Sequence, residues 1–325
     1  MRRLLPILIL VGCPLPGDKA EEPETAVETF TQGDFGEIDQ LWVVDDSPSM
    51  QNEQEAIADE VPDLLAAFGD AGVTYHVGVM TSDMTADIAS SGHLIGDPTF
   101  VTPETPDAAA ALVEAITLEG HGDDKERTYE AAITGLTPPL SETVNASFLR
   151  EGALLSLVVV SDENDCSDFG GLGEGATGED CYERWDDLVP VEELVGMLRD
   201  VTPDVVVHGI VGPNVTEACA DSVPGKRHFE AIARTGGVEA SICDEDYGTF
   251  VDATSPVVTG QYTRFALAHP ADPDTLEVEV DGAGVAEDDT AGWTYDDTYW
   301  QIVFHGDAVP PRGSTITVSY EVAGG

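Results

Sequence analysis

In the middle of the chain, segments with two different spacings of apolar residues alternate along the sequence. Short β-branched and apolar runs predict buried strands, and they span residues 41–44, 73–81, 154–160 and 205–211. Between these runs apolar residues recur every three or four positions, as in amphipathic helices, over residues 57–68, 108–116, 129–136, 191–198 and 229–233. Strands that alternate with helices predict a doubly wound, mostly parallel α/β sheet with helices on both faces. We expect this domain to span residues 38–260, with Pro62 kinking or dividing its first helix.

After Thr263, apolar residues recur at every second position. Alternating residues at 276–280, 300–304 and 316–320, with a turn at Asp281-Gly282, are typical of strands in an antiparallel sheet. We therefore expect residues 261–325 to form a small C-terminal all-β, sandwich-like domain.

The N-terminus has the pattern of an export signal. A basic Met1-Arg2-Arg3 precedes an apolar run, residues 4–11, that is too short to span a bilayer. The run ends in Leu-Val-Gly-Cys13, which resembles a bacterial lipobox. We expect residues 1–12 to be a lipoprotein signal peptide, Cys13 to be lipidated, and residues 13–37, rich in Pro, Glu and Thr, to be a flexible acidic tether. An ordinary secretory signal with a stray cysteine is the alternative.

The charge is strongly acidic, with 63 Asp plus Glu against 13 Lys plus Arg, a formal net charge of −50. Such a surface repels phosphates, so nucleic acid is excluded as a partner and membrane contact is expected through the lipid alone. The surface either suits salty surroundings or collects many calcium ions.

Four cysteines remain besides Cys13, an even number that suits an exported protein. We expect the pairs Cys166–Cys181 and Cys219–Cys243, because sequence-local pairing closes modest loops. The spacing contains no Cys/His zinc motif.

Oxygen-bearing side chains follow the first strand at alternate positions. Val43-Val44 is followed by Asp45, Ser47 and Ser49, and Asp162 follows the run at 154–160. Carboxyl ends of parallel strands meet at one edge of a sheet, where ligands bind. Carboxylates and hydroxyls there suit hard cations such as Mg²⁺.

This D-x-S-x-S pattern resembles the metal-ion-dependent adhesion site (MIDAS) of von Willebrand factor type A (vWA) domains, over residues 38–260. The resemblance implies a vWA/Rossmann-like fold that holds Mg²⁺ or Ca²⁺, with Mn²⁺ also possible, through Asp45, Ser47, Ser49 and Asp162. The family adds a threonine from a middle loop. Its expected position falls near Glu126 rather than Thr128, so either residue is a candidate.

The segment after Asp162 is dense in further oxygen ligands. Glu163, Asp165 and Asp168 form a candidate second cation site. The alternative is an acidic loop held in place by the Cys166 disulfide.

The motifs favour binding over catalysis. No G-x-S-x-G, H-E-x-x-H or glycine-rich phosphate loop occurs, and of the scattered histidines only His121 falls in a loop facing the proposed site. We therefore expect no enzyme but a metal-dependent, adhesion-type protein-binding module, anchored by lipid in the bacterial envelope, on the outer membrane. A partner's Asp or Glu would take an open position on the ion. A structural scaffold with a purely stabilising cation is the alternative, and a metal-assisted hydrolase is a more remote one.

Overall fold

The computed structural model describes residues 25–33, 36–84, 91–118, 125–173, 175–214, 219, 222–258 and 262–323. The expected signal peptide, Cys13, the first part of the tether and His121 lie outside these residues. Within the described ranges no helix is both long and apolar enough to cross a membrane.

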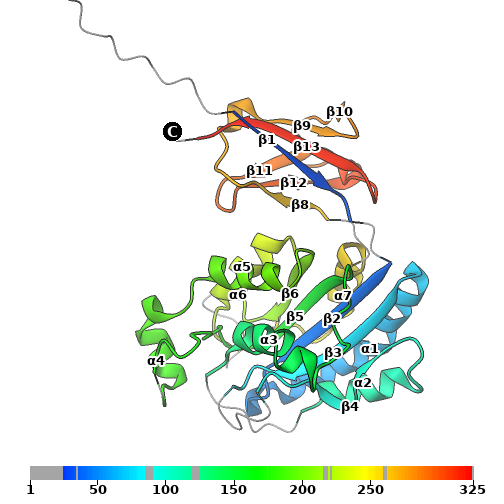
Figure 1. The fold of residues 1–325 in the computed structure, drawn as a ribbon, viewed down its shortest axis with the longest axis vertical. Helices are drawn as coiled ribbons and strands as arrows, with labels where there is room; N and C mark the ends of the chain where they lie inside the picture. The colour runs from blue at the N-terminus through cyan, green and yellow to red at the C-terminus, as the bar shows by residue number, and fades with distance from the viewer. Residues whose placement is uncertain are drawn as a thin grey trace, which may run out of the picture.

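A six-stranded mixed sheet forms the centre of the α/β domain (Figure 1). Its strands are β2 (Glu37–Val44), β3 (Thr74–Thr81), β4 (Ile95–Val101), β5 (Leu154–Ser161), β6 (Val205–Val211) and β7 (Glu239–Ser241). Their order is β4-β3-β2-β5-β6-β7, and all neighbours are parallel except β4, which is antiparallel to β3. The chain builds the sheet first to one side of β2 and then to the other, so the topological switch point lies between β2 and β5.

Helices cover both faces of this sheet, which confirms the α/β expectation. The longer helices are α1 (Gln51–Ala71), α2 (Ala108–Ile116), α3 (Thr128–Leu136), α5 (Val191–Val201), α6 (Lys226–Thr235) and α7 (Gly248–Val258). Trp42 and Val44 pack into the core on the side of α1, α2 and α7. Leu41 and Val43 point the other way, into the core beneath α3, α5 and α6. This alternation follows from the two-residue period of a strand.

Of the two expected effects of Pro62, a kink or a division of the first helix, the division does not occur. Helix α1 runs without a break from Gln51 to Ala71, with Pro62 inside it. Val61 and Leu64 on either side of the proline are buried in the core. Packing of this apolar face holds the helix together at the point where a backbone hydrogen bond is missing.

The β domain consists of two antiparallel sheets, ordered β1-β13-β9-β10 and β11-β12-β8. Its strands are β1 (Thr25–Thr31), β8 (Arg264–Ala266), β9 (Glu277–Val280), β10 (Ala283–Gly284), β11 (Trp293–Asp296), β12 (Gln301–Phe304) and β13 (Thr315–Glu321). Phe265, Trp293, Ile302 and Ile316 form its separate core. A sandwich-like arrangement of short strands, as expected, results.

The tether prediction is wrong for residues 25–31. They form β1, which pairs along its whole length with β13, from Thr25 opposite Glu321 to Thr31 opposite Thr315. Phe30 packs on Phe265, with ring centroids 5.5 Å apart. The β domain therefore begins before the α/β domain, which is inserted between β1 and β8.

This insertion determines which ends of the strands in the large sheet face away from the β domain. Strand β2 starts shortly after β1 ends, so the amino-terminal edge of the sheet faces the β domain (Figure 1). Gln32 fixes the junction by donating to the carbonyls of Tyr262 at 2.9 Å and Pro310 at 2.8 Å. The carboxyl ends of the strands lie at the opposite end of the domain. We call this far edge the rim.

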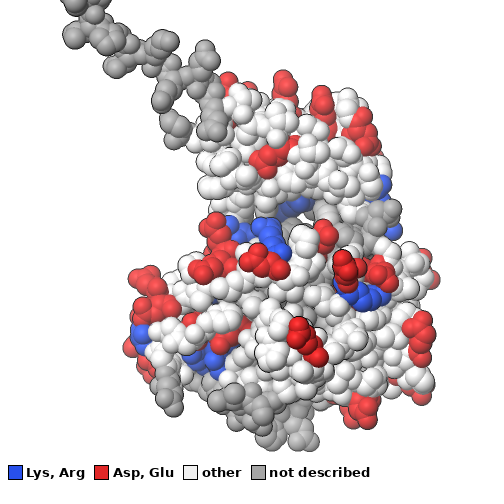
Figure 2. Space-filling view, viewed as in Figure 1, with Lys and Arg blue, Asp and Glu red and all other residues white. Residues whose placement is uncertain are grey.

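Figure 2 shows how the charge is spread over one face of the molecule. Acidic side chains occur on both domains, and the fewer basic side chains lie beside them. On this face the acidity belongs to the whole surface rather than to one patch.

Candidate functional site at the rim of the sheet

Asp45 lies at the switch point, one residue past the end of β2. Its backbone N–H donates to the Val160 carbonyl at 2.9 Å, which extends the β2–β5 ladder to the rim. The carboxylate is fully buried. It accepts hydrogen bonds from the Ser47 N–H at 2.8 Å and from the Ser161 hydroxyl at 2.7 Å. Neighbouring strand ends thus hold this carboxylate in one orientation.

The two serines of the motif follow Asp45 in a tight turn. Ser47 is buried and Ser49 is exposed, and their hydroxyl oxygens are 2.9 Å apart. A short 3-10 turn, Pro48–Met50, then leads into α1. Ser49 also bonds the side chain of Asp162, which extends from the end of β5. The structure therefore brings Asp45, Ser47, Ser49 and Asp162 together, as the sequence predicts.

The middle loop brings Glu126 and Thr128 to the same rim. Both side chains are buried, and Thr128 is the first residue of α3. The Glu126 carboxylate accepts a hydrogen bond from Ser82, which follows β3. The Glu126 carbonyl accepts from the Cys166 N–H at 2.6 Å, which joins this loop to the one after Asp162. Motif reasoning missed Ser82 and Ser161, which bond the carboxylates of Glu126 and Asp45, although both follow predicted strands.

Three carboxylates in this region disfavour one another's charge. Burial raises the pKa of Asp45, raises that of Glu126 well above its usual range, and raises that of Asp162 to about 6. The negative charge of Asp45 adds to the rise at both Glu126 and Asp162. Desolvated like charges are stabilised by a nearby cation.

The buried oxygen atoms without a hydrogen-bond partner at the rim include Oε1 of Glu126, Oγ1 of Thr128 and Oδ1 of Asp162. Buried polar atoms are nearly always paired, so each such atom needs a reason. Among the described residues, no three His, Cys, Asp or Glu side chains are close enough together to form a metal site by themselves. A cation at this rim would therefore need serine or threonine hydroxyls as ligands.

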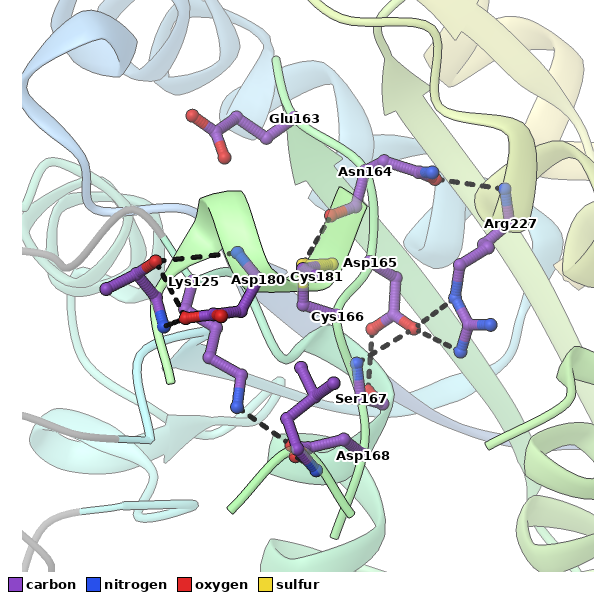
Figure 3. The surroundings of a disulfide bond; sticks show 12 residues. Lys125, Glu163, Asn164, Asp165, Cys166, Ser167, Asp168, Asp180, Cys181 and Arg227 are labelled. Atoms are coloured by element: carbon purple, nitrogen blue, oxygen red, sulfur yellow. Dashed lines mark hydrogen bonds and ion pairs between the residues drawn. A yellow bond between two sulfur atoms is a disulfide. The ribbon is translucent and has the colours of Figure 1, made fainter. Parts of the chain in front are cut away.

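The predicted second cation site is not formed by Asp165 and Asp168. Asp165 pairs with Arg227, whose Nη2 lies 2.9 Å from Oδ2, and accepts from the Ser167 hydroxyl at 2.6 Å. Asp168 pairs with Lys125 at 3.0 Å. Figure 3 shows Glu163 pointing away from Asp165. The expectation was wrong because two buried cations from distant segments already neutralise these carboxylates.

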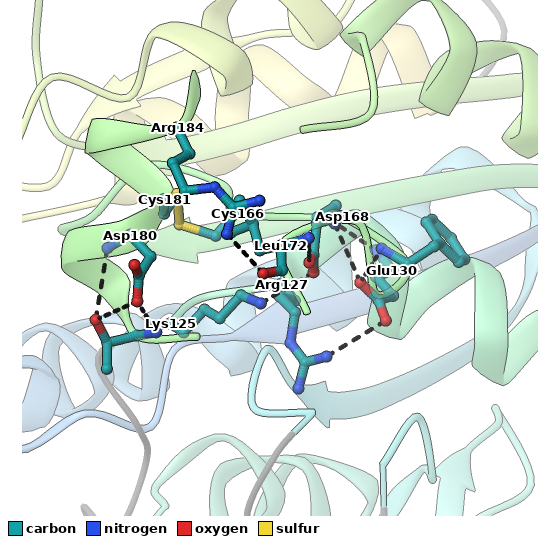
Figure 4. A network of polar contacts seen from close by, with 12 residues as sticks. Lys125, Arg127, Glu130, Cys166, Asp168, Leu172, Asp180, Cys181 and Arg184 are labelled. Atoms are coloured by element: carbon teal, nitrogen blue, oxygen red, sulfur yellow. Dashed lines mark hydrogen bonds and ion pairs between the residues drawn. A yellow bond between two sulfur atoms is a disulfide. The ribbon is translucent and has the colours of Figure 1, made fainter. Parts of the chain in front are cut away.

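Both expected disulfides are present, Cys166–Cys181 and Cys219–Cys243. The first closes the segment after Asp162 on itself, beside the Lys125–Asp168 pair (Figures 3 and 4). Glu130 of α3 accepts from the Phe169 N–H at 3.0 Å and forms an ion pair with Arg127 at 3.4 Å (Figure 4). The acidic loop is therefore bound firmly to the middle loop and to α3.

Comparisons with known proteins give only distant likenesses. No family model and no curated protein matches the sequence. Among solved structures, the chain is similar to the pilus adhesin SpaC from Lactobacillus rhamnosus GG in its open conformation, at 10% identity and a TM-score of 0.42, over 94% of this chain and 42% of the adhesin. It is also similar to proximal thread matrix protein 1 from the mussel byssus, at 11% identity and a TM-score of 0.40, over 74% of this chain and 52% of that one. The chain spans less than half of the adhesin, and at these TM-scores the likeness carries no argument about function.

Proposed function

We propose that this chain is a metal-dependent protein-binding module with a vWA-type domain, carried on the bacterial envelope by a lipid at Cys13. The observation that carries the proposal is the pair of unpartnered buried oxygens, Thr128 Oγ1 and Asp162 Oδ1, in the same rim as Asp45. Mg²⁺ and Ca²⁺ bind oxygen ligands of these kinds. The site lies at the switch point of the sheet, where such folds bind ligands.

Asp45, Ser47, Ser49, Thr128 and Asp162 are the ligands that we assign, directly or through water. Glu126 is assigned as a neighbouring charge rather than a ligand, because the vWA pattern that this rim resembles has a threonine at this place and the Glu126 carboxylate already accepts a hydrogen bond from Ser82. A bound divalent cation would supply the positive charge on which a partner's Asp or Glu coordinates. Ser49 is exposed, which leaves the site open to a partner on that side.

Calorimetric titration of the soluble chain with Mg²⁺, Ca²⁺ and Mn²⁺ tests the metal site. Asp45→Ala removes one ligand, and Asp59→Ala, at an exposed position on α1, is the matched control that removes the same charge. We expect saturable binding of about one ion in the wild type and in Asp59→Ala, and none in Asp45→Ala. Equal, weak, multi-site uptake in all three proteins would mean that the acidic surface only collects counterions.

A second measurement separates adhesion from a purely structural ion, an alternative that the full burial of Asp45 favours. Removal of the cation lowers the melting temperature in either case, because a ligand bound to the folded state stabilises it. Chelation should abolish the binding of proteins that present an Asp or Glu only if the site is of the adhesion type. Retention of such partners in the presence of chelator would leave the scaffold explanation.

A further inference from the structure

A hollow of about 380 Å³ opens close to the rim, and its lining differs from the acidic surface around it. The lining residues are Asn164, Tyr182, Trp185, Val223, Pro224 and Lys226. Two aromatic rings and two aliphatic side chains dominate this set, and no member is acidic. In a chain of net charge −50, such a lining calls for an explanation.

The hollow and the proposed metal site share two segments of chain. Asn164 follows Asp162 by two positions, and the Val223 N–H donates to the Asp162 carbonyl at 2.7 Å. Burial and the charges of Glu163 and Asp162 together raise the pKa of Tyr182 to about 12, so the phenol lies within electrostatic reach of the rim. The hollow and the proposed metal site are therefore neighbours at the rim.

The aromatic wall of the hollow, formed by Tyr182 and Trp185, adjoins a disulfide-linked core. Tyr182 adjoins Cys181, and Cys166, Leu172, Cys181 and Leu188 form a small core of their own beneath it. The Arg227 guanidinium lies over the Trp185 ring, 5.7 Å from its centroid, while it also pairs with buried Asp165. Yet Tyr182 and Trp185 are 41% and 39% exposed. Aromatic rings held open on a fixed base bind a partner at low entropic cost.

Lys226 adds a positive charge to this wall. It is one of three lysines in the sequence, is exposed, and makes no ion pair with any described residue. Lys125, by contrast, is buried against Asp168. An exposed lysine here offsets the general acidity where a partner that carries a carboxylate would approach.

We propose that this hollow binds an aromatic or large aliphatic side chain that flanks the metal-binding Asp or Glu of a protein partner. The occupant is thus an acidic segment with an adjacent apolar residue. This inference rests on the proposed function and adds a specificity element to it. Apolar contact supplies affinity that a lone carboxylate cannot gain on a strongly acidic surface.

A displayed library of random 12-residue peptides, sequenced after selection on the immobilised soluble chain, tests the inference. Selection is run in Mg²⁺ on the wild type, on Asp45→Ala and on the double variant Tyr182→Ser/Trp185→Ser. Trp300→Ser is the matched control, because Trp300 is a 40% exposed tryptophan in the β domain. A cooperative melting transition and intact disulfides establish that each variant is folded.

We expect the wild type and Trp300→Ser to enrich peptides with Asp or Glu within two positions of Phe, Tyr, Trp or Leu. The double variant should keep the acidic residue but lose about tenfold of the preference for the apolar neighbour. An acidic preference with no apolar neighbour, or an apolar preference unchanged in the double variant, overturns the inference and leaves the proposed function standing. Enrichment that needs no acidic residue and persists in Asp45→Ala, or no enrichment at all, counts against both.

Discussion

The Ser161 hydroxyl donates a 2.7 Å hydrogen bond to the Asp45 carboxylate, although the two residues are 116 positions apart. This bond joins the ends of β2 and β5 across the switch point. Together with the Ser47 N–H, which donates to the other oxygen, it fixes the orientation of the Asp45 carboxylate.

Replacement of Ser161 by Ala should weaken cation binding at the proposed site. Groups that orient a ligand change metal affinity by about 10- to 100-fold, and loss of the bond should cost about 1–3 kcal/mol of stability. Ser156→Ala is the control, since Ser156 is buried in the same strand and accepts from Gln40 at 3.2 Å instead. Calorimetry should show reduced affinity in the first variant only. Equal affinities in both would contradict the positioning role of Ser161.

Asp162 makes the metal-free protein sensitive to pH. Its folded-state pKa of about 6 lies above the ordinary value of 3.8, so the folded state binds this proton more tightly than the unfolded state does. The resulting stability is fully present below pH 3.8 and is lost as the pH rises through about 6. In chelator, Asp162→Asn should therefore melt higher than wild type at pH 7.5, and the difference should shrink towards pH 4.5. Thermal scans at several pH values check this, and an unchanged difference would refute it.

Glu126 and Thr128 should behave oppositely when each is replaced. Thr128→Ala removes a proposed ligand and should lower cation affinity with little change in the stability of the metal-free protein. Glu126→Gln removes a buried charge whose pKa is raised well above its usual range, so it should stabilise the metal-free protein and retain saturable binding. Parallel melting and titration experiments separate the two, and loss of binding only in Glu126→Gln would reverse the assignment.

The pair of Asp165 and Arg227 should prove structural. Asp165→Asn leaves the guanidinium of Arg227 buried without its charge partner, which typically costs about 3–5 kcal/mol. Denaturant unfolding measures this loss. The stoichiometry of cation binding should stay as in the wild type, whereas loss of one bound ion would restore the second-site hypothesis.

Removal of β1 should unfold the β domain selectively. A chain that begins at residue 37 lacks the strand that pairs with β13 and the Gln32 side chain at the junction. Hydrogen exchange should show loss of protection in β13, with the α/β sheet still protected. A chain that begins at residue 25 is the control. Equal protection of β13 in both chains would contradict the role of β1.

The sequence predicted the features that are local or periodic. Strand and helix patterns placed β2, β5 and β6, and the positions just after strands placed Asp45 and Asp162 at one rim. Local pairing also predicted both disulfides. Each of these follows from a short segment of chain and the rules of parallel sheets.

The sequence did not predict features that depend on distant partners. Residues 25–31 form a strand because β13, almost 300 residues later, pairs with them. Asp165 and Asp168 resemble metal ligands locally, and only the fold reveals that Arg227 and Lys125 reach them. Helix α1 passes through Pro62 because its neighbours are packed in the core. In each case a tertiary contact outweighs the local signal.

The insertion of one domain into the other gives the molecule a short mechanical path. From Thr25 the chain runs through β1, crosses the junction and continues through β2, a central strand, to Asp45 (Figure 1). If the chain is anchored at its amino-terminal side, tension from a partner held at the rim travels along this covalent line. The load would then be borne by two extended strands, each paired within a sheet, and would bypass the contacts between the two domains.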